Sequence, residues 1–165
     1  NSVAVLTDQE TEEDLKKLGE DIFRYFGLGC RSVSKLFVPH GYDFDKFFNA
    51  IYQYKEVIYY DKYVNNYDYN KAVYLMSQYQ LLENGFLMLK EDQSYASPIA
   101  TVFYEYYDDK DVLQRRLEAD KELIQCVVGS SDQIKMVGFG ETQNPQLWDY
   151  ADDVDTLDFL QGLKG

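Results

Sequence analysis

The segment Ile124-Gln125-Cys126-Val127-Val128 is almost wholly apolar. Strands with apolar side chains on both faces are typical of a parallel sheet that helices cover on both sides. The sequence therefore predicts a buried strand at 124–128. It also predicts that the rest of the chain supplies the neighbouring strands and the covering helices.

The chain before this strand contains segments that fit the same sheet. Short apolar segments predict four further strands, at 3–6, 34–38, 85–89 and 99–106. Apolar residues at helical spacing predict four helices. The first runs from a start near Thr7 to Gly27, with its apolar residues between Leu15 and Phe26; the others are at 43–58, from Asp68 or Asn70 to about Gln78, and at 112–123. Alternating strands and helices indicate crossover connections. The expected fold class is α/β, a three-layer sandwich with a mostly parallel sheet, in one domain over residues 1–165.

Both ends of the first predicted helix carry a local signal. Thr7-x-x-Glu10 has the spacing of a capping box, in which a hydroxyl and a carboxylate bind the free amides of a helix start. Gly27 is a usual helix terminator. A short turn, Gly27-Leu28-Gly29-Cys30, is therefore expected between this helix and the strand at 34–38.

The composition limits the partners of the protein. The chain has 165 residues, with 16 Lys and Arg against 29 Asp and Glu, a formal net charge of −13. Nucleic acids and anionic membranes would be repelled, so neither is expected as a partner. No signal peptide or membrane span is recognisable, and with only two cysteines a cytoplasmic location is expected. The 16 Tyr and 10 Phe indicate either a ligand cleft or homo-oligomer contact, or tyrosines lying over the core.

The two cysteines lie in different settings. Cys126 is part of the apolar strand, where a thiol behaves as a small hydrophobe. Cys30 lies in a turn whose glycines let a substrate approach closely. The adjacent Arg31 favours a thiolate, and the amides of Cys30, Arg31 and Ser32 could bind an oxyanion if a helical turn starts there. The negative end of the preceding helix opposes thiolate formation. Cys30 is thus a candidate nucleophile, and the alternative is a cysteine that only fills a turn.

Other candidates for chemistry are weaker. The single histidine, His40, is ten residues from Cys30, but no Asn or Asp is apparent to orient it as a dyad requires. The acidic clusters lack the glycine-centred pattern of calcium loops, so no metal is expected.

Several strings resemble the catalytic domain of aldehyde dehydrogenases. Gly27-x-x-Cys30 followed by Ser34-Lys35-x-Phe37-Val38 is similar to the nucleophile loop and next strand of that family. Ser97-Pro98 before a strand resembles its Phe-Gly-Pro segment. Gly138-Phe139-Gly140 resembles its Pro-Phe-Gly-Gly turn.

Within this superfamily the chain resembles acyl-CoA reductases of the bacterial luminescence (fatty acid reductase) type. The strings that carry this resemblance are Tyr25 to Arg31, Asn84 to Leu87 and Leu147 to Asp152. The resemblance implies an aldehyde dehydrogenase-like catalytic domain that reduces acyl-CoA to an aldehyde. Cys30 would attack the thioester, coenzyme A would leave, and hydride from NADPH would reduce the thioacyl enzyme.

The resemblance also implies where the cofactor is bound. No Gly-x-Gly-x-x-Gly occurs in the chain, so NADPH is expected to be bound mainly by a separate domain that this chain does not contain. The general base would lie before Asn1. Ser94, Ser97, Pro98 and Phe139 are expected to line the cofactor or substrate site, although many dehydrogenases have a glutamate where Ser94 stands.

Two alternatives remain open at this stage. One is an aldehyde dehydrogenase that runs the reverse oxidation. The other is a non-catalytic interaction domain that binds a partner through its tyrosine-rich surface. Acylation of Cys30 would separate the interaction domain from both enzymes, and dependence on coenzyme A would separate the two enzymes.

Overall fold

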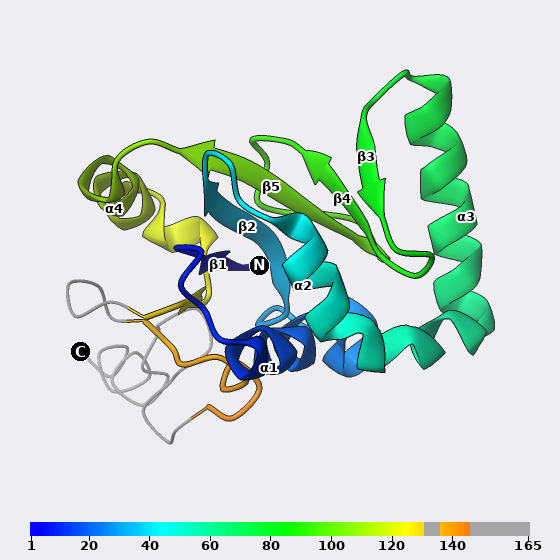
Figure 1. The fold of residues 1–165 in the computed structure, drawn as a ribbon, viewed down its shortest axis with the longest axis horizontal. Coiled ribbons are helices and arrows are strands. Elements are labelled where there is room, and N and C mark those ends of the chain that lie inside the picture. The colour runs from blue at the N-terminus through cyan, green and yellow to red at the C-terminus, as the bar shows by residue number, and fades with distance from the viewer. Residues whose placement is uncertain (131–135, 146–165) are drawn as a thin grey trace, which may run out of the picture.

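The computed structural model describes residues 1–130 and 136–145 (Figure 1). Their strands are β1 (Ser2–Val5), β2 (Val33–Pro39), β3 (Leu81–Glu83), β4 (Met88–Glu91), β5 (Thr101–Tyr107) and β6 (Val127–Val128). Their α-helices are α1 (Glu12–Phe23), α2 (Phe44–Ala50), α3 (Asp61–Met76) and α4 (Lys110–Ala119). Three 3₁₀ segments follow helices: η1 (Arg24–Gly27), η2 (Ile51–Tyr59) and η3 (Lys121–Leu123). The string Leu147 to Asp152 lies outside the described residues.

The six strands form one sheet in the order β3-β4-β5-β2-β1-β6. All neighbouring pairs are parallel except β3 and β4, which are antiparallel. Of the buried strand predicted at 124–128, only Val127 and Val128 form a strand, which pairs with β1, and only Val128 of these two is buried. The predicted α/β fold with a mostly parallel sheet is confirmed.

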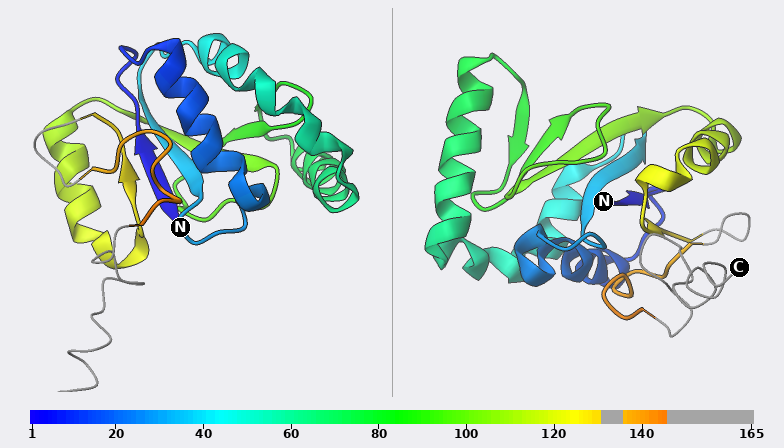
Figure 2. Two further views of the ribbon diagram at one scale, coloured as in Figure 1. Left: turned by 90° about the horizontal axis from the view of Figure 1, so that it is seen from below. Right: turned by 180° about the vertical axis from the view of Figure 1, so that it is seen from behind.

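Helices pack against both faces of the sheet. Alternate residues of β2 point to opposite faces: Leu36 belongs to the larger core with α1 and α2, and Phe37 to a smaller core with α4. The same alternation in β1 separates Ala4 from Val5. Figure 2 (left) shows β1 between α1 and α4. The turn that contains Cys30 precedes β2. It therefore lies at the amino-terminal ends of the central parallel strands, next to the end of α1.

α3 runs beside β3 and β4 (Figure 1). Tyr67 donates a hydrogen bond to the carboxylate of Glu83 in β3, and Lys71 Nζ lies 2.7 Å from the same carboxylate. The hydroxyl of Tyr63 donates to the carbonyl of Phe86 at 2.9 Å. The hydroxyls of the two buried tyrosines and the ammonium group of Lys71 thus hold α3 to β3 and to the loop before β4.

The first helix begins later than its expected cap. The capping box is formed by Thr11 and Asp14, because Thr11 has the extended backbone of an N-cap and its side chain accepts from the amide of Asp14. Thr7 and Glu10 do hydrogen-bond to each other, but within the turn that precedes the helix. The predicted cap at Thr7 is therefore wrong.

Other boundaries also differ from the prediction. The helix expected over 43–58 divides into α2 and η2, and the one expected from Asp68 or Asn70 begins at Asp61. β3 was not expected. The strand expected at 85–89 starts at Met88, because the side chain of Asn84 accepts hydrogen bonds from the amides of Phe86 and Leu87 and ties them into a turn.

Candidate functional site

The turn between η1 and β2 exposes one of the two cysteines. Cys30 is exposed and Cys126 is buried. The carbonyl of Cys30 accepts a hydrogen bond from Ser2 Oγ at 3.4 Å, which connects the turn to β1. The two thiols therefore differ in their access to a reagent in solution.

The approach to Cys30 contains three successive residues in the left-handed region. Tyr25, Phe26 and Gly27 have φ values of 56°, 60° and 73°. This conformation costs residues other than glycine about 1 kcal/mol or more. The Phe26 ring packs against the Tyr60 ring, with centroids 4.9 Å apart. Strained backbone of this kind is concentrated at binding and catalytic sites, and here it precedes the exposed thiol.

The residues that follow Cys30 are held by a distant segment. Arg31 Nε donates a hydrogen bond to the carbonyl of Thr142. Gln143 Nε2 donates to Ser32 Oγ at 3.4 Å. The buried Ser32 also donates its amide to the carbonyl of Gly29 at 2.9 Å. Because that amide is engaged inside the turn, the expectation that it points at an oxyanion does not hold.

The segment around Phe139 packs against α1. Phe139 itself is buried in the larger core, so its ring is not presented to a ligand. Gly140 has a φ of 83°, and a Cβ there would lie 3.1 Å from Lys17 Cβ. Only glycine combines that backbone conformation with so close an approach. Phe139 therefore serves to anchor the segment that reaches the Cys30 turn.

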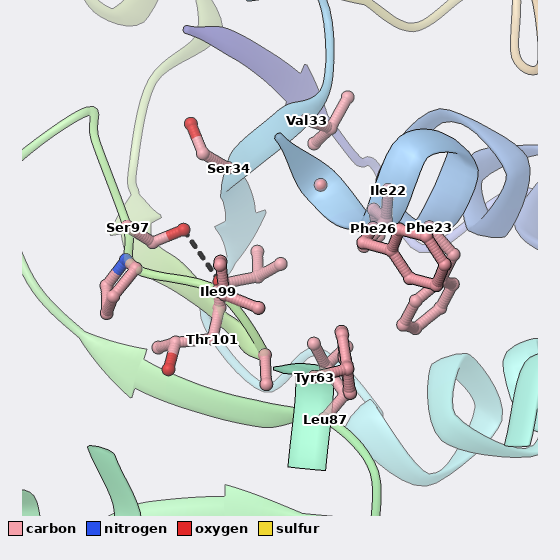
Figure 3. A pocket seen from close by; sticks show the side chains of 14 residues that line it. Ile22, Phe23, Phe26, Val33, Ser34, Tyr63, Leu87, Ser97, Ile99 and Thr101 are labelled. Atoms are coloured by element: carbon pink, nitrogen blue, oxygen red, sulfur yellow. Dashed lines mark hydrogen bonds between the residues drawn. The ribbon is translucent and has the colours of Figure 1, made fainter. Parts of the chain in front are cut away.

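Ser97 and Pro98 line a narrow pocket beside the same turn (Figure 3). Phe26 and Gly27 from before Cys30 and Val33 from after it line the same pocket. Its cavity volume of about 20 Å³ is enough for about one water molecule. Ser97 Oγ donates to the carbonyl of Thr101 at 2.6 Å. The structure thus brings Ser97 and Pro98 next to the residues that flank Cys30.

Ser94 lies in the loop between β4 and β5. Its amide donates to Asp92 Oδ1 at 2.9 Å. The loop is fixed at the neighbouring Tyr95, whose carbonyl accepts from Ser34 Oγ at 2.6 Å. The Ser94 amide is therefore used inside this loop and is not directed at the thiol.

A buried lysine that was not a candidate holds the same loop. Lys35 Nζ donates to the carbonyls of Asp92 and Gln93 at 3.0 and 2.8 Å, and to Glu105 Oε2 at 2.7 Å. Burial lowers the pKa of Lys35, and the hydrogen bond to Glu105 opposes that effect. With three acceptors around it, this ammonium group has a structural role on the α4 side of the sheet.

Cys30 and His40 cannot form a dyad. Cys30 precedes β2 and His40 follows it. A strand of this length, at about 3.3 Å per residue, separates them by roughly 25 Å. His40 instead stacks on Tyr106, with ring centroids 4.9 Å apart, and its Nε2 lies 3.2 Å from Asp108 Oδ1.

The residue that sequence reasoning missed is Asp21 of α1. Its side chain is completely buried, and its carboxylate accepts from the amide of Gly140 at 2.7 Å. It also accepts from the amide and hydroxyl of Thr142 at 3.0 and 2.8 Å. Burial raises the pKa of Asp21, although these hydrogen bonds oppose the rise. Its place on the apolar face between Leu18 and Ile22 was the signal available in the sequence.

The α-helix starts among the described residues are unfavourable for the diphosphate of a dinucleotide. Phosphate groups bind at uncapped helix starts, where free amides and the helix dipole attract negative charge. Here the starts of α1, α2 and α4 are capped by their own Thr11, Asp43 and Asp109 side chains. The start of α3 has no side-chain cap, but like the other three helices it has an acidic residue in its first turn. A bound phosphate would meet negative charge at each of them.

The described residues contain neither a metal-ligand cluster nor a membrane-spanning helix. Within 1–130 and 136–145, no three or more His, Cys, Asp or Glu side chains are grouped so that they could hold a metal ion. Across the same part of the chain, no helix has the length and apolar character needed to cross a membrane.

Comparison with known proteins adds no relative: no protein-family model and no curated protein matches this chain.

Proposed function

We propose that this chain is the thiol-bearing catalytic domain of an acyl-CoA reductase with an aldehyde dehydrogenase-like fold. Its own chemistry is transfer of an acyl group from coenzyme A to Cys30. The observation that carries the proposal is the exposed thiol of Cys30. The backbone before it is strained, and the two residues after it are hydrogen-bonded to Thr142 and Gln143. A fixed and accessible thiol is what acyl transfer requires.

The transfer has two steps. Cys30 loses its thiol proton to solvent, and the thiolate sulfur attacks the thioester carbonyl carbon, so a carbon–sulfur bond forms and the carbonyl oxygen becomes negative. The oxyanion then collapses, the bond to the sulfur of coenzyme A breaks, and that thiolate takes up a proton. One thioester replaces another, so no oxidant or reductant is needed. A cysteine can do this near neutral pH because its thiolate is a strong nucleophile even when sparsely populated.

NADPH remains part of the proposal as the reductant of the whole enzyme. Because the helix starts of the described residues are unfavourable for its diphosphate, we assign its binding mainly to a separate domain outside residues 1–165. No step of the acyl transfer depends on it.

The test is acylation of the isolated chain. Incubation with excess acyl-CoA should add one acyl mass, which peptide analysis should locate on Cys30. Cys30→Ser should abolish the adduct, because a hydroxyl without an adjacent base is a much poorer nucleophile. Cys126→Ala is the matched control and should still be acylated. An adduct on Cys126, or none on either cysteine, would contradict the proposal.

A second candidate is a non-catalytic interaction domain. It is favoured by exposed apolar side chains near the Cys30 turn: two lie next to it in the sequence, and a third, Tyr60, contacts Phe26. Tyr25, Leu28 and Tyr60 are 62%, 68% and 57% exposed. A chain that forms no acyl adduct but binds a protein partner through these side chains would fit this candidate better.

A further inference from the structure

Asp21 is a carboxylate on the buried face of a helix. Its neighbours on that face, Leu18, Ile22 and Phe23, belong to the larger core. Removing a charged group from water is costly unless hydrogen bonds replace the lost hydration. Three bonds do so, and all three come from one short segment, 140–142. The carboxylate therefore fixes that segment against α1.

The segment held by Asp21 is the one that holds the Cys30 turn. Thr142 is fully buried, and its carbonyl accepts from Arg31, the residue after Cys30. The next residue, Gln143, donates to Ser32. It also lies beside Gly29, where an added Cβ would be 3.6 Å from Gln143 Nε2. Both sides of Cys30 thus contact a segment that the Asp21 carboxylate holds at Gly140 and Thr142, next to the buried ring of Phe139.

We propose that Asp21 is a positioning residue for Cys30, acting through the Gly140 and Thr142 backbone. The inference rests on the proposed role of Cys30 as the nucleophile. Asp21 does not touch the reacting atoms. It keeps Thr142 and Gln143 where they fix the backbone on the C-terminal side of the thiol.

The chemistry of the three donors explains why a carboxylate is needed. Oδ2 accepts from Gly140, and Oδ1 accepts twice from Thr142. Every partner is an N–H or O–H donor, so both oxygens must act as acceptors. Asparagine has the same shape but only one acceptor oxygen, and its NH₂ group would face a donor. Asp21→Asn should therefore release either Gly140 or Thr142 with little change in side-chain volume.

The experiment compares Asp21→Asn with the wild-type chain. Three quantities are measured: the rate of Cys30 acylation by acyl-CoA, the rate of Cys30 alkylation by iodoacetamide, and hydrogen exchange of the Ser32 amide. Misplacement by about 1 Å can cost on the order of 10²-fold in rate. We expect acylation to slow by about tenfold or more, alkylation to change much less because the thiol stays exposed, and Ser32 exchange to accelerate.

Two further variants serve as controls. Glu13→Gln removes an exposed carboxylate from the same helix and should leave all three measurements unchanged. Thr142→Val removes only the hydroxyl bond to Asp21 and should give a smaller effect in the same direction, and Thr142→Ser should restore wild-type rates. Should Asp21→Asn fail to fold, the Thr142 pair carries the test.

The outcomes distinguish this inference from the proposed function. If the wild-type chain is acylated and Asp21→Asn is acylated at the same rate, the positioning role is overturned. A uniform loss of stability, with an unchanged ratio of acylation to alkylation, would also overturn it. Absence of acylation in the wild type would overturn the proposed function instead. The Ser32 exchange would then decide whether Asp21 holds the turn, and unchanged exchange would count against it.

Discussion

Lys35 and Glu105 form an ion pair between neighbouring strands, with Lys35 Nζ 2.7 Å from Glu105 Oε2. The lysine side chain is completely buried, and the glutamate side chain is 21% exposed. The glutamate also binds Arg116 of α4. One carboxylate thus connects β2, β5 and α4 on the side of the sheet opposite α1.

This arrangement predicts a large cost for removing the lysine. Lys35→Met leaves Glu105 and two loop carbonyls without their shared donor, and breaking a buried pair typically costs about 3–5 kcal/mol. Arg116 remains beside Glu105, so we expect a loss of unfolding free energy of about 2–4 kcal/mol, measured by urea unfolding. Lys62→Met, at an exposed position of α3, is the control and should change stability little. Equal stability of Lys35→Met and wild type would contradict the structural role of this lysine.

Asp92 predicts a pH-dependent contribution to stability. Burial alone would raise the pKa of Asp92, but hydrogen bonds from Lys90 and Ser94 outweigh it and lower the pKa to about 2. An aspartate with an unfolded pKa of about 3.9 then contributes stability on the order of 2 kcal/mol above pH 5. This contribution is lost as pH falls from about 4 through 2.

Urea unfolding of Asp92→Asn measures that contribution. The difference from wild type should be largest near pH 7 and should shrink between pH 4 and pH 2. Asp68→Asn, at an exposed position, should show a smaller difference at neutral pH. A difference for Asp92→Asn that does not vary with pH would show that the carboxylate charge is not the cause.

The left-handed backbone of Tyr25 predicts a stabilising substitution. Tyr25 is 62% exposed and has a φ of 56°, so glycine should relieve strain while removing little buried surface. We expect Tyr25→Gly to stabilise the chain by about 0.5–1 kcal/mol in thermal or urea unfolding. Gly27→Ala, at a φ of 73°, should destabilise it by about 1 kcal/mol. Tyr59→Gly tests the same exposed residue type in η2, and stabilisation there would show that the gain at Tyr25 does not come from its backbone conformation.

Different exposure of the two thiols predicts different rates of alkylation. Cys30 is exposed, and Cys126 is only 5% exposed. In the native protein iodoacetamide should modify Cys30 well before Cys126, as followed by peptide mass analysis. In urea the two rates should approach each other. Faster labelling of Cys126 in the native protein would mean that the apolar strand opens more readily than the turn.

The acidic first turns of α1, α2, α3 and α4 predict weak cofactor binding by this chain alone. Calorimetry with NADPH should detect no binding at micromolar concentrations. Micromolar affinity would contradict the assignment of the cofactor to a separate domain.

The sequence was sufficient for the type of fold and for the contrast between the two cysteines. Apolar strands that alternate with helices predict a parallel sheet, because strands buried on both faces consist almost entirely of apolar residues. The start of α3 was missed because its buried side chains, Tyr63 and Tyr67, have polar tips and weaken the apolar pattern. β3 was missed because two of its three residues are exposed, so its pairing with β4 decides its structure.

The candidate site was predicted less completely than the fold. A glycine-bounded cysteine is visible locally, whereas the contacts that fix it depend on tertiary structure. The partners of Asp21, Gly140 and Thr142, are about 120 residues away in the sequence, so its role is visible only in the tertiary structure. The engagement of the Ser32 amide by Gly29 depends on the conformation of a turn, which residue types alone do not determine.

The distance in sequence between Arg31 and Thr142 has a consequence during synthesis. These partners are 111 residues apart, and Asp21 and Thr142 are 121 apart. A chain is made from its N-terminus, so Cys30 leaves the ribosome long before the segment that fixes its turn. A nascent chain that ends before residue 140 already contains Cys30 but lacks the hydrogen bonds that join Thr142 and Gln143 to the Cys30 turn. If Cys30 is the nucleophile that we propose, its turn reaches its final conformation only after nearly the whole of this chain has been translated.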